Sequence, residues 1–94
     1  MISCNGDKCA LSGALTLENV VTVLEESGRV LPSAGRVVID LAGVTEVDSS
    51  AVSLLLELRR GALRQNRVIE YVNLPHNLQS LAELYGVSEL LVAS

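Results

Sequence analysis

Apolar and polar residues alternate near the start of the chain, which is the spacing of a β-strand. Two short segments, Ile2–Cys4 and Lys8–Thr16, flank Asn5-Gly6-Asp7, and Asn-Gly is the pair that best tolerates the positive φ angles of a tight hairpin. Small residues such as Ala10 and Ala14 blur the alternation in the second segment, so the pairing register stays open. The pattern predicts an N-terminal β-hairpin.

The spacing of apolar residues changes to that of an amphipathic helix over Thr16–Gly28. Its apolar residues recur at positions i, i+3, i+4 and i+7 and form one stripe, Leu17, Val20, Val21 and Leu24. The segment starts with a hydroxyl residue suited to an N-cap, Thr16, and ends with a glycine suited to a C-cap, Gly28. We therefore predict a first helix whose stripe faces the core, followed by a loop over Arg29–Gly35.

A mostly apolar run at Arg36–Leu41 predicts a strand buried on both faces, as in a sheet fed by crossover helices. Ala42–Asp48 is expected to form the loop after this strand, and the next helix is expected from Ser50 to Gln65. The stripe of this helix that should face the sheet consists of Ala51, Leu54, Leu55, Leu58 and Ala62. A second apolar stripe consists of Val52, Leu56 and Leu63. This second stripe needs its own partner, either the third helix or another protein.

The chain then repeats strand and helix. Arg67–Asn73 is predicted as a strand parallel to Arg36–Leu41, because a helix joins the two. A third helix begins at Pro75, ends at Gly86, and carries one apolar stripe, Leu78, Leu81, Ala82 and Tyr85. Ser88–Leu91 predicts a short last turn, and Val92–Ser94 a tail or brief edge strand. The order of elements predicts a single α/β domain over residues 1–94, in which helices pack on a small mixed β-sheet made of the N-terminal hairpin and βαβα units.

Composition excludes several classes of partner. The 94 residues suffice for one core, and that core is expected to be aliphatic because aromatic residues make up only 2% of the chain. The net charge of −4 and the lack of aromatic platforms argue against nucleic acid as a partner. No apolar run approaches the roughly 20 residues of a membrane span, and Met1–Asp7 does not resemble a signal peptide. We therefore expect a cytoplasmic protein without direct membrane insertion.

Catalytic chemistry has little support in the sequence. His76 is the only histidine, and Asp40 and Asp48 lie too far apart along the chain to be read as an acid–base pair. The sequence also lacks a phosphate-binding glycine loop. Cys4 and Cys9 offer two metal ligands where a structural zinc needs four, so two free thiols are expected. The prediction is a non-catalytic protein with no metal and no cofactor.

The most informative polar residues are Asp48, Ser49 and Ser50, which follow a predicted strand and open a helix. Capping of the helix N-terminus accounts for one of them and needs no function. It does not account for two hydroxyls and a carboxylate at one exposed corner beside a second apolar stripe. The positive end of the helix dipole at this corner favours an anion or an acceptor group of a partner.

The run from Ile39 to Ala51, followed by a leucine-rich helix, resembles the signature of the STAS domain family, which includes anti-anti-sigma factors and the C-terminal domains of sulfate transporters. In anti-anti-sigma factors the motif is Asp-Ser-Ser/Thr-Gly, and a partner kinase phosphorylates the residue before the glycine. The matching residue here is Ser50, but Ala51 replaces the glycine. The resemblance implies the STAS fold.

The second half of the chain narrows the resemblance. Asn73-Leu74-Pro75, the run Leu81–Val87 and the pair Leu90-Leu91 look like the MlaB-like subfamily, which contains small single-domain STAS proteins of the Mla phospholipid-transport ABC system. In that subfamily the hydroxyl residue directly after the aspartate of the motif helps to grip the ATPase subunit. The matching residue here is Ser49.

The resemblance implies a non-catalytic subunit that binds an ABC transporter ATPase (MlaF-like), and through it a permease and a periplasmic lipid-binding subunit, on the cytoplasmic side of the inner membrane. Its expected contact residues lie on and beside the start of the second helix: Asp48, Ser49, Ser50, Val52, Ser53, Leu56 and Arg60. The alternative is an anti-anti-sigma factor regulated by phosphorylation at Ser50. A third hypothesis is that the protein itself carries a lipid. Lipid binding needs an apolar cavity of several hundred cubic ångströms, for which a core of this size leaves little space.

Overall fold

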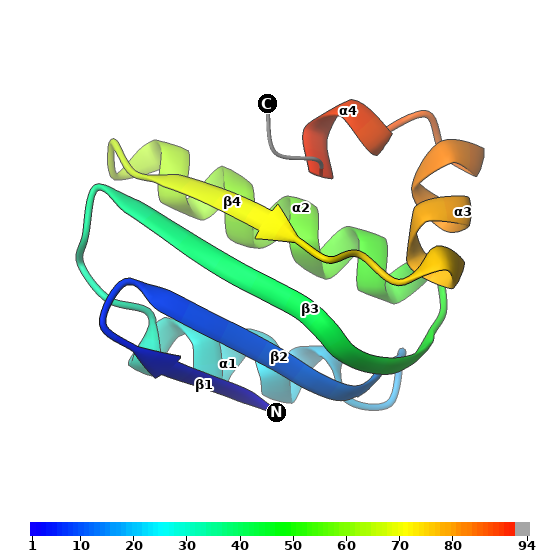
Figure 1. The fold of residues 1–94 in the computed structure, drawn as a ribbon, viewed down its shortest axis with the longest axis horizontal. Helices are drawn as coiled ribbons and strands as arrows, with labels where there is room; N and C mark the ends of the chain where they lie inside the picture. Colours follow the sequence, from blue (N-terminus) through cyan, green and yellow to red (C-terminus); the bar gives the residue numbers. More distant parts are fainter. Residues whose placement is uncertain (92–94) are drawn as a thin grey trace.

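The computed structural model describes residues 1–91 as a four-stranded mixed sheet with helices packed against it (Figure 1), which confirms the predicted α/β architecture. Val92–Ser94, for which a tail or edge strand was expected, lie outside the described residues. The elements in order are β1 (Ile2–Asn5), β2 (Lys8–Leu15), α1 (Val20–Val30), β3 (Arg36–Val47), α2 (Ser49–Arg64), β4 (Val68–Val72), α3 (His76–Leu84) and α4 (Ser88–Leu91).

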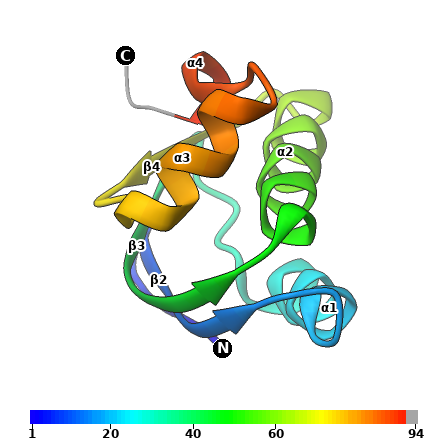
Figure 2. The ribbon, with the colours of Figure 1, turned by 90° about the vertical axis from the view of Figure 1, so that its right-hand side faces the viewer.

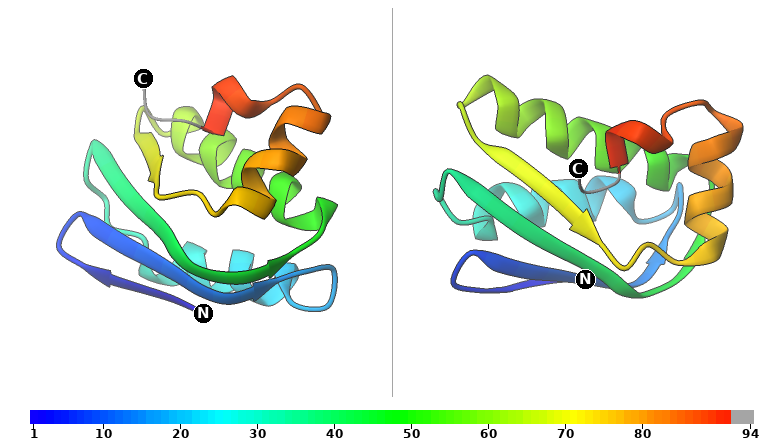
Figure 3. Two further views of the ribbon diagram at one scale, coloured as in Figure 1. Left: turned by 45° about the vertical axis from the view of Figure 1, so that its right-hand side comes forward. Right: turned by 45° about the horizontal axis from the view of Figure 1, so that its top comes forward.

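The strands follow one another across the sheet in the order β1-β2-β3-β4. β1 pairs antiparallel with β2, whereas β2 with β3 and β3 with β4 are parallel. In Figures 1 and 2, α1 and α2 lie side by side on one face of the sheet. In the view of Figure 1, α1 lies behind the hairpin and α2 behind β4. α3 and α4 pack against the side of α2 that is turned away from α1 (Figure 3). The helices therefore leave the other face of the sheet uncovered.

The uncovered face corrects one expectation about β3. Val37, Ile39 and Leu41 are buried towards the helices, but Val38 is only half-buried and Arg36 is exposed. The strand is therefore buried on one face rather than both, because only one layer of helices is present.

The length of β3 corrects a second expectation. The predicted loop at Ala42–Asp48 is wrong up to Val47, because β3 continues beside β2 through two register shifts. Gly43 permits this approach, since a Cβ atom there would lie 3.1 Å from the Cβ of Ser12 and 3.3 Å from the carbonyl oxygen of Leu11. An Ala-Gly pair that looked like the start of a loop is therefore a close contact between two strands.

The first helix differs from its prediction in both bounds and orientation. Residues 16–19 form a turn, α1 begins at Val20, and it continues through Gly28 to Val30. Val23 and Ser27 are the buried residues, and the hydroxyl of the 0%-exposed Ser27 donates a hydrogen bond of 2.8 Å to the carbonyl oxygen of Val23. Of the predicted inward stripe only Val20 is partly buried. The face with Val23 and Ser27 therefore packs inward, and the bulkier Val21 and Leu24 lie outward.

The later elements match their predictions more closely. The inward stripe of α2 is confirmed, since all five of its residues are buried. β4 is parallel to β3, and the start of α3 after Pro75 and the positive φ of Gly86 (+70°) are as expected. Tyr85, expected on the inward face of α3, is instead 53% exposed at its C-terminal end. Tyr71 of β4 donates a hydrogen bond of 2.7 Å to the carbonyl oxygen of Leu55, which ties α2 to the sheet.

The two cysteines form a disulfide, so the expectation of two free thiols is wrong. The hairpin register places Cys4 directly opposite Cys9, with their Cα atoms 4.0 Å apart. The turn residues Gly6 and Asp7 set this register, and Gly6 has a φ of +66°. Cysteine chemistry therefore gives no argument for a reducing compartment.

Candidate functional site

The corner between β3 and α2 is organised by the carboxylate of Asp48. One oxygen, Oδ1, accepts a hydrogen bond of 2.8 Å from the backbone N–H of Ser50, which makes Asp48 the N-cap of α2. The other oxygen, Oδ2, accepts a hydrogen bond of 3.0 Å from the backbone N–H of Leu17, in the turn before α1. A single side chain therefore connects the starts of the two helices that lie side by side.

These hydrogen bonds lower the pKa of Asp48 below its ordinary value of 3.8. The N–H of Leu17 is the largest cause, and the backbone N–H and hydroxyl of Ser50 add to it, while partial desolvation opposes them. The charged form of Asp48 is therefore the form that holds the corner together.

The serines of the corner lie at its surface. Ser49 and Ser53 are exposed, and Ser50 is half-exposed next to the capping carboxylate. The side chains of Ser49, Ser50 and Ser53 line a shallow hollow of about 350 Å³ between α1 and α2, which Val21 and Leu24 of α1 also line. From the sequence we predicted these serines at the exposed start of a helix, and they lie there. The sequence did not show that α1 lies beside them.

The other expected contact residues differ from one another in how exposed their side chains are. Arg60 is exposed, and its guanidinium lies 3.1 Å from the carboxylate of Glu57 on the same helix. Leu56 is half-buried against the core. Val52 is only 4% exposed, so it does not lie at the surface as an expected contact residue would, and of the two partners left open for its stripe it is a helix of this chain that covers Val52. On a helical wheel Val52 lies on the opposite side of α2 from Leu54, which lines the hollow shared with α1, so the covering helices are α3 and α4, which α2 also contacts.

The apolar residues that sequence reasoning missed at this site belong to α1 and the turn before it. Leu17 is 76% exposed, Val21 65% and Leu24 38%. Their spacing was recognised in the sequence but was assigned to the core. A second stripe on the same helix, Val20, Val23 and Ser27, was the available sign that the two faces compete for the sheet.

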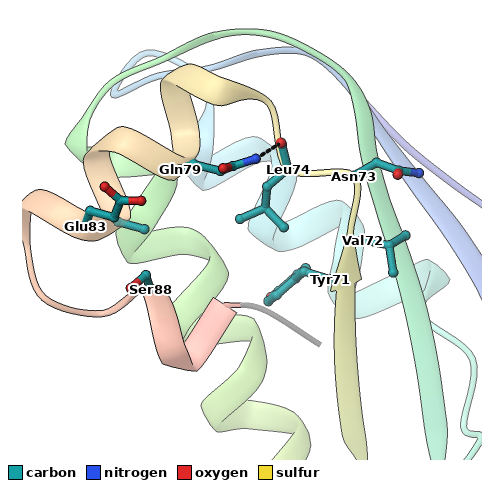
Figure 4. A pocket seen from close by; sticks show the side chains of 8 residues that line it. Tyr71, Val72, Asn73, Leu74, Gln79, Glu83 and Ser88 are labelled. Carbon is teal, nitrogen blue, oxygen red and sulfur yellow. Dashed lines mark hydrogen bonds between the residues drawn. The ribbon is translucent and has the colours of Figure 1, made fainter. Parts of the chain in front are cut away.

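A larger hollow lies elsewhere, between β4 and α3, with a volume of about 620 Å³ (Figure 4). It is lined partly by apolar side chains such as Val72 and Leu74, and partly by polar ones, including Asn73, Gln79 and Glu83. The amide of Gln79 donates a hydrogen bond of 2.8 Å to the carbonyl oxygen of Leu74 at its rim. The hollow is larger than the sequence led us to expect, but it is open and its mixed lining does not suit an acyl chain.

Within residues 1–91, no group of three or more His, Cys, Asp or Glu side chains is placed to hold a metal ion. Asp40 and Asp48 have separate hydrogen-bond partners, because Asp40 accepts hydrogen bonds from the N–H of Ala42 (2.8 Å) and from the amide of Asn73 (3.2 Å), whereas Asp48 accepts them from Leu17 and Ser50. His76 is an exposed residue at the start of α3. Among the described residues, no helix is both long and apolar enough to cross a bilayer.

Comparison with solved structures shows the fold. The anti-sigma factor antagonist SpoIIAA, in its unphosphorylated form, is similar over 100% of this chain and 86% of its own, with 13% sequence identity and a TM-score of 0.75. A protein described as Mglu is similar over 81% of this chain at 20% identity and a TM-score of 0.64, and the match spans only 20% of the Mglu chain. No curated protein sequence matches.

Comparison with protein families gives the assignment. The profile of the STAS_2 family, described as "Mlab, STAS domain", matches residues 3–93. This match covers nearly the whole chain, and it agrees with the SpoIIAA-like fold and with the exposed Asp-Ser-Ser corner at the start of α2. Fold and family therefore agree on a STAS domain. The chain belongs to the MlaB-type STAS domain family.

Proposed function

We propose that this protein is a non-catalytic regulatory subunit that binds the ATPase of a phospholipid-transporting ABC complex and supports its assembly and ATP hydrolysis. In this role it is held at the inner membrane indirectly, through a complex that also contains a permease and a periplasmic lipid-binding subunit. The match to the MlaB-type family over residues 3–93 is the observation that carries this proposal.

The geometry of α2 supports the same role. Ser49, Ser53 and Arg60 all lie exposed on its outer face, and Asp48 fixes the start of the helix through two hydrogen bonds. A rigid helix end with exposed hydroxyls suits docking, because little conformational entropy is lost when a partner binds. Leu56 borders this face and adds apolar area, whereas Val52 contributes by packing α2 against α3 and α4.

The test is co-purification of the ATPase with variants of the outer face of α2. Ser49→Arg and Ser53→Arg place a bulky charge on exposed positions and are expected to abolish co-purification without unfolding the domain. Leu56→Asp is expected to do the same, but circular dichroism must accompany it because Leu56 packs partly against the core. Thr22→Arg, on an exposed position of α1, is the matched control. Undiminished co-purification with both arginine variants of α2 would contradict the proposed contact.

A second candidate function is an anti-anti-sigma factor switched by phosphorylation of Ser50. The similarity to SpoIIAA over the whole chain favours it. A phosphate on Ser50 would lie beside the carboxylate of Asp48, where like charges repel, so it would weaken the cap that joins α2 to Leu17. Mass spectrometry after incubation with the serine kinases of the same cell decides between the candidates. Stoichiometric phosphoserine at position 50 favours the switch, and its absence under every condition counts against it.

A further inference from the structure

The disulfide between Cys4 and Cys9 lies at the edge of the sheet, in the hairpin of β1 and β2. The N–H of Ser12 donates a hydrogen bond of 2.9 Å to the carbonyl oxygen of Met1, and the amine of Met1 donates one of 2.9 Å to the carbonyl oxygen of Ser12. Hydrogen-bonded and non-hydrogen-bonded pairs alternate along an antiparallel ladder, so Cys4 and Cys9 form a non-hydrogen-bonded pair, in which side chains lie closest. The backbone pairing of the hairpin therefore holds the two sulfur atoms near each other whether or not they are bonded.

The disulfide contributes little to holding the domain together. Its two cysteines have a sequence separation of only 5, and the stabilisation that a disulfide gives by restricting the unfolded chain is smallest for short loops. The turn at Gly6 and Asp7 already reverses the chain, and the N–H of Val38 in β3 donates a hydrogen bond of 3.0 Å to the carbonyl oxygen of Asp7. We therefore expect the domain to stay folded when the bond between the sulfur atoms opens.

The two cysteines differ in how easily another thiol can reach them. Cys9 belongs to the second strand of the sheet and is only 4% exposed. Cys4 belongs to the edge strand and is half-buried. Exchange between a thiol and a disulfide depends on access to the sulfur that is attacked. Cys4 is therefore the point of attack.

From these observations we infer that Cys4 and Cys9 form a reversible redox modification site, at which Cys4 exchanges with low-molecular-weight thiols and Cys9 is the resolving thiol. For its compartment this site rests on the proposed function, because a subunit on the cytoplasmic side of the inner membrane meets a pool of thiols that reduces accessible disulfides. A disulfide in that compartment is usually transient or redox-sensing rather than structural.

The reaction is two successive thiol–disulfide exchanges. The thiolate of a small thiol attacks Sγ of Cys4, the bond to Cys9 breaks, and its electron pair stays on Sγ of Cys9, which takes up a proton. A second thiolate attacks the outer sulfur of the mixed disulfide, and Sγ of Cys4 leaves with the electron pair and takes up a proton. Two small thiols are thereby oxidised to one small disulfide, and the Cys4–Cys9 bond is reduced to two thiols. The small disulfide closes the bond again by the reverse steps.

The edge strand β1 is the part of the molecule that responds to this reaction. It spans four residues, and no described strand other than β2 pairs with it. Ile2 is 7% exposed and α1 packs against the strand. Without the covalent bond, β1 is held by its turn, its hydrogen bonds and these contacts alone, so it opens locally more often. The redox state of the pair therefore sets how firmly this edge of the sheet is closed.

The first test places the full chain in glutathione buffers whose ratios run from those of a reducing cytosol to those of an oxidising compartment. Thiols are blocked with a maleimide and counted by mass spectrometry, while circular dichroism records the fold. The expected result is two thiols at the reducing end, none at the oxidising end, and a folded spectrum throughout. No thiols in the absence of denaturant, thiols only in unfolded protein, or no disulfide in any buffer would overturn the inference.

Amide hydrogen exchange tests the response of β1 in the same samples. Exchange at Ala10, which lies opposite Ser3 in the hairpin, is expected to be at least about fivefold faster in the thiol form. Exchange at Leu55 in α2 is the control and should be the same in both forms. Equal exchange at Ala10 in the two forms would show that the bond does not control the edge strand.

Two single variants test the different roles of the cysteines. Cys9→Ala leaves Cys4 as the single thiol, and Cys4→Ala leaves Cys9. Mixed-disulfide formation with oxidised glutathione should be at least about tenfold faster for folded Cys9→Ala, because Cys4 is the accessible sulfur. In denaturant, where both thiols are exposed, the two rates should agree within about twofold, which controls for intrinsic reactivity. Equal native rates, or a faster reaction of Cys4→Ala, would overturn the assignment of Cys4.

The outcomes also separate this inference from the proposed function. If the protein binds the ATPase but its disulfide cannot be reduced without unfolding, the redox inference fails and the proposed function stands. If the protein does not bind the ATPase but cycles between thiol and disulfide while folded, the proposed function fails and the redox site stands.

Discussion

Replacing Val52 with alanine separates the packing of α2 from its role in docking. Val52 is 4% exposed and lies where α3 and α4 cover α2. The substitution removes methyl groups worth about 0.8 kcal/mol each by transfer from water and leaves a cavity behind. Together these terms predict a loss of about 2–3 kcal/mol of unfolding free energy, which lowers the melting temperature of a domain of this size by roughly 10–20 °C.

The assay for this variant combines thermal unfolding with an ATPase-binding titration below the melting temperature. Val52→Ala is expected to melt earlier and to bind the ATPase like wild type, whereas Ser53→Arg on the neighbouring exposed position is expected to do the reverse. A Val52→Ala protein that keeps its melting temperature but loses ATPase binding would refute the reasoning, since Val52 would then be a surface contact and the packing of α3 and α4 on α2 would be misassigned.

Three further changes test individual interactions. Asp48→Asn should lower the melting temperature, and the difference from wild type should be largest at pH values above 3.8, the ordinary pKa of Asp. This difference should shrink as the pH falls through the lowered pKa of Asp48 in the folded state, because the wild-type protein then loses the same charge. A difference that grows in acid would contradict this. Tyr71→Phe removes the hydrogen bond to the carbonyl oxygen of Leu55 and should lower the free energy of unfolding in urea by about 1 kcal/mol. An unchanged urea midpoint would show that the hydroxyl contributes nothing. Burial also raises the pKa of Tyr71, so in the native protein its absorbance should not change in the pH range where an ordinary phenol titrates. Cys4→Ala together with Cys9→Ala opens a small loop of sequence separation 5 and should cost about 2 kcal/mol by loop-closure entropy, with equal melting of oxidised and reduced wild type as the contrary result.

The parts of the fold that the sequence predicted are those with a single strong pattern. The inward stripe of α2 could be predicted because Leu55 and the other four residues of that stripe recur at helical spacing, and the second stripe of the helix is smaller. The cap at Asp48 was readable because an aspartate before two serines satisfies the first amides of a helix. The resemblance to the STAS family rested on the same residues, so the same part of the sequence predicted both the fold and the family.

The parts that failed depend on contacts between elements distant in the sequence. α1 offers two apolar faces, and only the shape of the sheet decides that Ser27 rather than Leu24 packs inward. The extension of β3 depends on the fit of Gly43 against β2, and the disulfide depends on a hairpin register that the weak alternation left open. At the candidate site, the serines were predictable but the apolar wall from α1 was not, because its residues had been assigned to the core.

Amide hydrogen exchange of the complex with the transporter ATPase tests the central claim most directly. If the start of α2 is the docking site, exchange should slow at the amides of Ser49 to Ser53 when the ATPase is added, and the uncovered sheet face around Lys8, Val38 and Val72 should be unaffected. Protection confined to the sheet face, with unchanged exchange at the start of α2, would contradict the account.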